Sequence, residues 1–261
     1  MKGWAVERAR PPGVTGLELW DHPLEGRPLF EHVGAERLAA DRAAGIAEEA
    51  IARRMVAALA RAVAALDAAG EVWIDGGLTR LDGFASACAA FDRPVRLGGG
   101  GRFAGEVGAA RWLGDGVLVL DLGQTALKCS SPGGARASFE RVPLDSRPAI
   151  VEWIAGSVAR ARRSAPGELL LALPAALDAA GVPGPSTYAG LEGYAELGRD
   201  LLRALGERLE LPARGRLRLV NDAELAACAA RPVAARCLAL TLGFGPGAAL
   251  VDPLDGPARS R

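Results

Sequence analysis

The first candidate site is a short run that combines an acidic residue, a glycine and a hydroxyl residue. It extends from Asp121 through Gly123 and Gln124 to Thr125. A glycine lets the backbone approach a phosphate, threonine offers a hydroxyl and an N–H, and aspartate can hold a water molecule of a metal ion. Lys128 follows closely and would attract phosphate. An ordinary hairpin turn and an outward-facing strand lysine are the simpler interpretations.

Two further glycine-rich segments are typical of nucleotide binding. Thr241, Gly243 and Gly245 lie between two apolar runs, as in a phosphate-binding hairpin, although a plain glycine turn gives the same pattern. Gly76 and Gly77 end an apolar run and precede a helix-forming one. There they would let a nucleotide lie against the backbone near a helix N-terminus, and a tight turn explains them equally well.

Asn221 and Asp222 are the candidates for acid–base chemistry. They follow a predicted strand and open a predicted helix. At the carboxyl end of a strand, Asp222 would be placed to accept a proton from a substrate hydroxyl. As the N-cap of the helix, Asp222 would need no further role.

These residues require elements that bring them together, and the sequence supplies strands and helices in a regular order. Three apolar runs separated by turn residues predict three strands, and alternating helical and strand patterns follow. The predicted strands are 117–122, 127–131, 137–142, 168–173 and 216–220, and the predicted helices are 145–163, 195–211 and 223–230. The order from residue 116 is βββαβαβα.

The rest of the chain gives the same order when its two ends are joined. The predicted elements are strands 236–242 and 248–251, extended segments 4–8 and 14–20, a helical region 35–69 broken near Gly45, strand 72–75, helix 81–91, strand 94–97 and helix 103–113. Such an order predicts a circular permutation, which close chain termini make tolerable. We therefore expect an α/β protein with residues 116–235 as one domain and residues 1–115 plus 236–261 as the other.

Composition limits the classes of partner. The 261 residues include 31 basic and 31 acidic side chains, so no net charge attracts nucleic acid or an anionic membrane. The longest uncharged stretch, 237–251, is shorter than the ~20 residues of a spanning helix, and no basic-then-apolar leader opens the chain. These features predict a cytoplasmic protein. The four cysteines form no close pair, which argues against a disulfide framework or a zinc site.

Taken in this order, the motifs resemble those of the ROK family of sugar kinases and regulators, in the superfamily of sugar kinases, heat-shock ATPases and actin. The run DLGQTALK resembles the first phosphate motif, LTLGFGPGAAL the second, IDGGL with GEVGAARWL the adenosine motif, and LVNDAELAA the Asn-Asp segment. The resemblance implies an α/β fold of two ribonuclease-H-like lobes, each βββαβαβα, that close on ATP in a circularly permuted chain.

The resemblance assigns roles to these residues. It implies that Asp222 is the general base for a sugar hydroxyl, that Asn221 binds the sugar, and that Asp121 holds Mg²⁺ through water. N–H groups at 123–125 and 243–247 would bind the phosphates of ATP. The implied function is an ATP-dependent phosphotransferase acting on a sugar hydroxyl of a hexose or amino sugar.

The N-terminal segment resembles the family's remaining sugar motifs less closely. Glu18 and Glu31 match two sugar-binding glutamates. His22 matches the family's histidine only if one residue is inserted, because strict spacing places Asp21 there. No cysteine lies between His22 and Glu31, so the family's zinc motif is missing. A glutamine, Gln124, also replaces a glycine of the first phosphate motif, and a proline follows Gly245 in the second.

Two other functions agree with parts of the sequence. The altered phosphate motifs are also typical of a sugar- or nucleotide-binding regulatory protein that has lost turnover. Residues 99–104 fit the pattern of a dinucleotide-binding loop, with Asp121 ending the next strand, but hairpin strands follow where that fold needs a crossover helix. The expected partners are ATP and a sugar, without nucleic acid or membrane, and the sequence leaves open whether the chain forms a homodimer.

Overall fold

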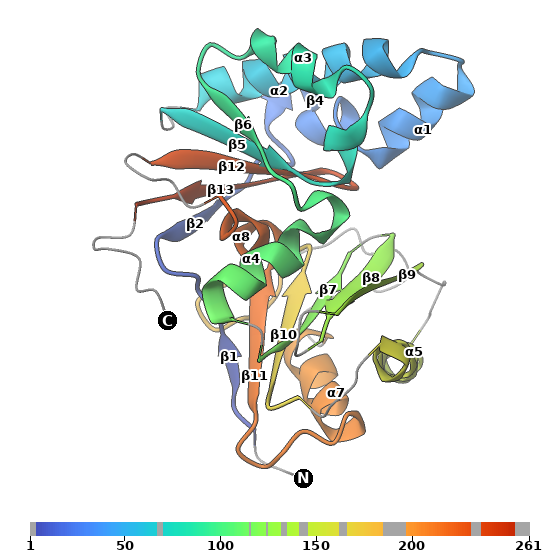
Figure 1. Ribbon diagram of the computed structural model, residues 1–261, viewed down its shortest axis with the longest axis vertical. Helices are drawn as coiled ribbons and strands as arrows, with labels where there is room; N and C mark the ends of the chain where they lie inside the picture. Colours follow the sequence, from blue (N-terminus) through green and yellow to red (C-terminus); the bar gives the residue numbers. More distant parts are fainter. Residues whose placement is uncertain are drawn as a thin grey trace. The chain divides into compact units, whose positions relative to one another are not determined.

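The computed structural model describes residues 4–66, 70–114, 116–123, 125–131, 135–140, 146–161, 166–184, 197–230 and 236–253. The chain divides into two compact units. Unit 1 comprises residues 1–10 and 105–225, and unit 2 comprises residues 11–104 and 226–261. Each unit is built around a mixed sheet with helices, which confirms the α/β class (Figure 1).

Unit 1 contains a six-stranded sheet of order β1-β11-β10-β7-β8-β9. Its central strand β7 is buried at every position, as expected for a strand covered on both faces. β7, β8 and β9 are antiparallel neighbours, whereas β10, β11 and β1 continue from β7 in parallel. The strands are β1 (Val6–Arg8), β7 (Leu118–Leu122), β8 (Ala126–Ser130), β9 (Arg136–Glu140), β10 (Glu168–Leu173) and β11 (Arg216–Asn221).

Helices cover both faces of this sheet. α5 (Arg147–Ala161) and α7 (Leu202–Arg208), the latter preceded by the π-helical turn η5 (Leu197–Leu201), pack on one face. α5 presents Ile150, Ile154 and Val158 to the sheet at helical spacing, and all three are buried. α4 (Ala104–Leu113) and α8 (Asp222–Ala227) contribute Ala109 and Leu225 to the core on the opposite face.

Unit 2 contains a five-stranded sheet of order β2-β13-β12-β5-β6. β12, β13 and β2 are antiparallel neighbours, and β5 and β6 continue from β12 in parallel. The five strands have the same spatial order and relative directions as five strands of unit 1: β12, β13, β2, β5 and β6 correspond to β7, β8, β9, β10 and β11. The strands are β2 (Val14–Leu17), β5 (Glu71–Asp75), β6 (Val95–Leu97), β12 (Cys237–Leu242) and β13 (Pro246–Val251), and a separate ribbon pairs β3 (Pro23–Leu24) with β4 (Arg27–Pro28).

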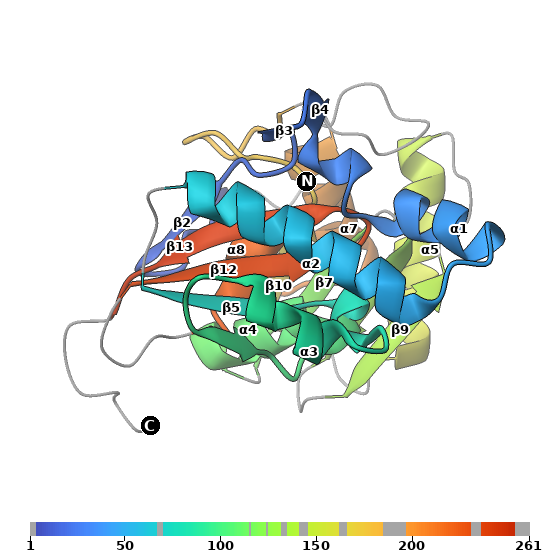
Figure 2. The same cartoon turned by 90° about the horizontal axis from the view of Figure 1, so that it is seen from above.

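The long helix α2 (Glu48–Ala65) lies over the sheet of unit 2 (Figure 2). Its buried face packs against strand residues such as Ile74 and Leu240 in one hydrophobic core. The predicted break near Gly45 is confirmed, since α1 (Ala35–Ala43) ends before it and Gly45 has a φ of 72°. The shorter helices of unit 2 are α3 (Phe84–Ala87), η1 (Leu29–Glu31), η2 (Gly77–Arg80), η3 (Cys88–Ala90) and η4 (Gly101–Phe103).

The units differ from the predicted domains at three places. Residues 226–230, expected in the domain 116–235, belong to unit 2. β1 pairs with β11 of unit 1, although residues 4–8 were expected with the other domain. Residues 105–113 of α4 also belong to unit 1, because the boundary falls within the first turn of that helix. Strand and helix patterns are local, so they do not reveal which of two sheets an element joins. Across the described residues, no helix is both long and apolar enough to cross a bilayer.

β1 is attached to unit 1 by a buried ion pair. Arg8 Nη2 donates to Glu224 Oε1 at 2.8 Å and to Oε2 at 2.6 Å, and the two side chains are only 7% and 13% exposed. Removing one partner of such a pair leaves a buried charge, so we expect Arg8→Met to lower the free energy of unfolding by about 3 kcal/mol. Urea unfolding of the full chain measures this, with the exposed neighbour Arg10→Met as control. Equal stability of the two variants would show that the Arg8–Glu224 ion pair does not stabilise the attachment of β1.

Candidate functional site

The proposed catalytic residues lie at one edge of the sheet in unit 1. β7, β10 and β11 run parallel, so their carboxyl ends meet at the same edge. Asp121 lies opposite Ala172 of β10, and Asn221 lies opposite Leu173, the last residue of β10. Asp222 follows Asn221 directly as the first residue of α8. The fold therefore brings together Asp121 and the Asn-Asp pair, which are far apart in the sequence.

Asn221 is the residue that caps helix α8. Its Oδ1 accepts the N–H of Glu224 at 3.1 Å, and its Nδ2 donates to the carbonyl of Ala175 at 3.0 Å. An acceptor three residues before an N–H of the first turn is the typical N-cap arrangement. The capping role considered for Asp222 thus belongs to Asn221. Since both groups of the Asn221 amide are engaged within the protein, a sugar would have to share them.

Asp121 and Lys128 form a largely buried ion pair across the β7–β8 ladder. Lys128 Nζ contacts Asp121 Oδ2, and the side chains are 22% and 5% exposed. Lys128 is therefore not an outward-facing strand lysine. Burial lowers its pKa, but the carboxylates of Asp121, Glu106 and Asp222 outweigh this effect and raise the pKa above its usual value. The other oxygen of Asp121, Oδ1, is buried and has no hydrogen-bond partner within the described residues.

Two further carboxyl groups near this pair are unusually hard to ionise. Burial and the neighbouring charge of Asp121 raise the pKa of Asp222 to about 7, while Lys128 opposes the shift. The same two causes raise the pKa of Glu106 to about 8. A base whose pKa lies close to neutral pH is suited to accepting a proton in a reaction. Sequence reasoning missed Glu106, because a single glutamate in an Ala- and Gly-rich helix gives no sign that tertiary packing buries it.

The first glycine turn uses its own backbone groups. The N–H of Gly123 donates to the carbonyl of Ala126 at 3.1 Å and so closes the β7–β8 hairpin. Thr125 is exposed at the tip of this turn. Gln124 lies outside the described residues. Of the predicted phosphate ligands here, Thr125 is accessible, whereas the Gly123 amide is already engaged.

The second glycine turn, between β12 and β13, is packed against an aromatic ring. The N–H of Gly243 donates to the carbonyl of Gly245 at 3.3 Å. A Cβ on Gly245 would collide with the six-membered ring of Trp20, which explains why glycine is needed there. Thr241 is half-buried on β12, opposite Asp75 of β5. The small size of Gly245 is therefore explained by packing, without a phosphate.

The turn at Gly76 and Gly77 is organised by Asp75. A Cβ on Gly76 would collide with the backbone of Leu242, whereas one on Gly77 would meet nothing within 4 Å. The buried carboxylate of Asp75 accepts N–H bonds from Gly76 at 2.8 Å, Gly100 at 2.9 Å and Gly101 at 2.7 Å. Asp75 therefore occupies the anion position of the glycine loop at 99–104, and the amides of Gly100 and Gly101 are not free to bind a pyrophosphate. Gly77 remains exposed and open to a ligand.

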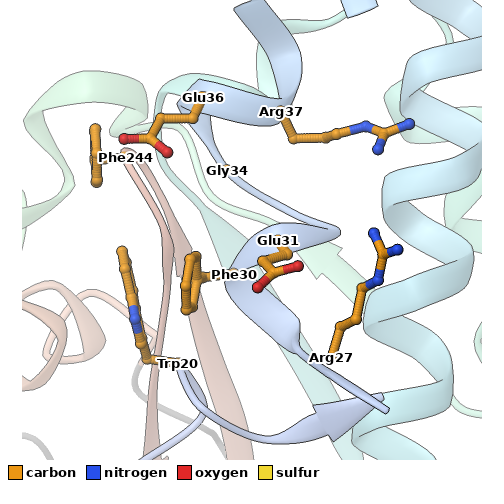
Figure 3. A pocket seen from close by; sticks show the side chains of 8 residues that line it. All are labelled: Trp20, Arg27, Phe30, Glu31, Gly34, Glu36, Arg37 and Phe244. Carbon is orange, nitrogen blue, oxygen red and sulfur yellow. The ribbon is translucent and has the colours of Figure 1, made fainter. Parts of the chain in front are cut away.

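A pocket of about 210 Å³ in unit 2 lies beside the second glycine turn (Figure 3). Trp20 stacks on Phe30 with ring centroids 4.8 Å apart and on Phe244 at 6.2 Å. These rings form one wall, and charged side chains of both signs line the rest. The lining residues are Trp20, Arg27, Phe30, Glu31, Gly34, Glu36, Arg37 and Phe244.

The structure places only one of the three N-terminal residues predicted to bind sugar in this pocket. Glu31 lines the pocket, whereas Glu18 and His22 do not. Glu18 is exposed just beyond β2. His22 is half-buried, and its backbone carbonyl accepts the N–H of Leu29. Asp21 is exposed as well. The sequence analysis missed the aromatic residues of this pocket, although Trp20 closely precedes the segment from His22 to Glu31 and Phe30 lies within it.

Few side chains of the described residues are placed to bind a metal ion. Within the part of the chain that the structure describes, no group of three His, Cys, Asp or Glu residues could hold a metal ion. The four cysteines are free thiols. The unpartnered Oδ1 of Asp121 does fit a water molecule of a Mg²⁺ ion, which needs few protein ligands when phosphates supply others.

Comparisons with known proteins do not assign the chain to a family. No protein-family model matches it, and no curated protein matches it either. The function must therefore be inferred from the chemistry of the site.

Proposed function

We propose that the protein is an ATP-dependent phosphotransferase of the ROK type that acts on a sugar hydroxyl. The observation that carries this proposal is the position of Asp222. It lies at the carboxyl end of a parallel strand, half-buried beside the Asp121–Lys128 pair, and its pKa is about 7. A carboxylate in this state accepts a proton from an attacking hydroxyl more readily than an ordinary aspartate.

The topology of the two units supports the same proposal. In both sheets, three antiparallel strands are extended by two parallel ones in the same order, and in unit 1 the parallel strand β1 is added beyond them. This is the order expected for ribonuclease-H-like lobes. In unit 2, the first two strands of this order, β12 and β13, come from the C-terminal end of the chain, and the third, β2, comes from near the N-terminal end. That origin is what a circular permutation would produce.

In the proposed reaction each acidic residue has a separate role. Asp222 accepts the proton of the sugar hydroxyl as that oxygen attacks the γ-phosphorus of ATP, and the bond to the β,γ-bridging oxygen breaks so that ADP leaves. Asp121 would hold a water molecule of Mg²⁺ through its unpartnered Oδ1, while Lys128 pairs with its other oxygen, Oδ2. When bound, Mg²⁺ supplies charge neutralisation on the phosphates. Within the described residues, the exposed members of the predicted nucleotide-binding set are Thr125, Gly77 and Gly243, and the amide of Gly243 is engaged within its own turn.

The pocket of unit 2, taken by itself, has the chemistry of a sugar-binding site. Flat aromatic faces beside charged hydrogen-bonding groups are suited to a ring that has apolar C–H faces and polar hydroxyl edges. Glu31 would accept hydrogen bonds from sugar hydroxyls, and the side chain of Arg27 would donate to their oxygens. ATP is abundant in the cytoplasm, so we also propose that the protein acts in that compartment.

A regulatory protein that binds sugar or nucleotide without turnover is the second candidate. The observation that favours it is that both glycine turns use their own amides, Gly123 in the first and Gly243 in the second. A phosphate clamp normally presents such amides to the ligand. Sugar binding without any phosphate transfer would distinguish this function from the kinase.

The pH dependence of turnover tests the role of Asp222. Because the base must be ionised, kcat/KM should be constant at high pH and fall as the pH drops below about 7. Lys128 holds the pKa of Asp222 down, so Lys128→Met should move the midpoint to higher pH. Lys128→Arg keeps the charge and serves as the control. A midpoint near 4, or one that Lys128→Met leaves unchanged, would exclude Asp222 as the base.

A further inference from the structure

Glu106 on α4 is in an environment that an ionised carboxylate does not tolerate alone. Its side chain is 0% exposed, and neither Oε1 nor Oε2 has a hydrogen-bond partner within the described residues. Burying a charged group without a partner is costly, so such groups are normally paired with a cation or kept neutral. The role proposed for Asp222 makes no use of Glu106.

A small cavity lies directly beside this carboxyl group, within unit 1. It has a volume of about 30 Å³, which is close to the space of one water molecule or one small ion. Its polar lining consists of Glu106, the two serines Ser130 and Ser131 at the end of β8, and Arg136 at the start of β9. The remaining lining residues are Ala110, Gly114, Val117 and Val119.

Among the described residues, no cationic side chain forms an ion pair with Glu106. Glu106, Asp121 and Asp222 are three acidic groups, and Lys128, the ammonium among them, is bound to Asp121. Arg136 lines the cavity, but its side chain is exposed to solvent and no ion pair joins it to Glu106. A cation inside the cavity would balance Glu106 where it is buried.

We propose that this cavity is a binding site for one monovalent metal cation, such as K⁺ or Na⁺, held by the carboxylate of Glu106 and by the hydroxyl oxygens of Ser130 and Ser131. Hard cations take oxygen ligands of this kind. A single carboxylate matches a single positive charge. A divalent ion fits less well, because no group of three acidic or metal-ligating residues surrounds the cavity in the described residues. The site does not depend on the proposed kinase activity.

Thermal unfolding at constant ionic strength tests the site directly. We expect the Tm of the wild-type protein to rise saturably, by about 3–5 °C, when KCl or NaCl replaces choline chloride at pH 8. Glu106→Gln keeps the shape of the side chain and removes its charge, so this variant should lose the rise. Arg136→Gln removes a competing positive charge at the cavity and should reach the same rise at a several-fold lower salt concentration.

Three results would overturn the proposal. If the wild-type Tm is the same in all three salts, Glu106 is simply a neutral acid beside a water molecule. If Glu106→Gln responds like the wild type, the cation binds elsewhere. Crystals grown with Tl⁺, a K⁺ substitute with strong anomalous scattering, should show a peak next to Glu106, and an empty cavity there would also refute the site.

Discussion

Asp222→Asn should lower kcat for sugar phosphorylation by about 10³-fold. Asparagine has nearly the same shape, so the hydrogen bond from the N–H of Ala223 to Oδ1, 2.7 Å long, can be retained. The amide, however, cannot accept the proton of the attacking hydroxyl. We therefore expect the loss in kcat, while the KM for ATP and the dissociation constant of the sugar change less than about threefold.

The variant Asp200→Asn is the matched control for this experiment. Asp200 is an aspartate of the same unit whose side chain is 52% exposed. Its substitution should leave kcat unchanged. Retention of more than about a tenth of the wild-type kcat by Asp222→Asn would show that Asp222 is not the general base. Far-UV circular dichroism and the urea midpoint confirm that both variants are folded.

Asp75→Ala should be among the most destabilising substitutions in unit 2. The carboxylate accepts three N–H bonds, from Gly76, Gly100 and Gly101, and these three glycines are buried. Without it, three buried donors lose their acceptor, which should lower the free energy of unfolding by about 4 kcal/mol. Asp75→Asn retains one acceptor oxygen and should cost roughly half as much.

Hydrogen exchange of the full chain locates this effect. In Asp75→Ala, amides of β5, β12 and the 98–104 loop should exchange faster, while those of β7 and β10 in unit 1 keep their protection. The exposed Asp82→Asn is the control and should leave all of them unchanged. Wild-type protection in the 98–104 loop of Asp75→Ala would mean that the carboxylate does not organise that loop.

The sequence predicted those features that depend on local pattern. The Leu-rich run of β10 is bounded by Glu168 and Leu173, as expected, because Pro174 cannot continue the ladder. The positions of Asp121 and Asp222 at strand ends could also be inferred, since each follows a recognisable apolar run. Parallel pairing of β7, β10 and β11 then brings their ends together.

Features that depend on tertiary contacts could not be predicted from local sequence patterns. Nothing in residues 4–8 indicates that β1 pairs with β11, because strand propensity carries no information about the partner. The glycines at 98–101 fit a ligand loop and a packed loop equally well, and only the contact with Asp75 decides between them. The stacking of Trp20 on Gly245 likewise joins residues from opposite ends of the chain.

Transfer of labelled phosphate from γ-³²P-ATP to a sugar tests directly whether the protein is an ATP-dependent sugar kinase. The purified full chain is incubated with Mg²⁺ and a panel of hexoses and N-acetylated amino sugars, and the products are separated by charge. We expect the wild type to form a labelled sugar phosphate with at least one acceptor, and Asp222→Asn to form none. Tight binding of a panel sugar by the wild type, without any labelled product, would contradict the proposed kinase activity and favour a regulatory function.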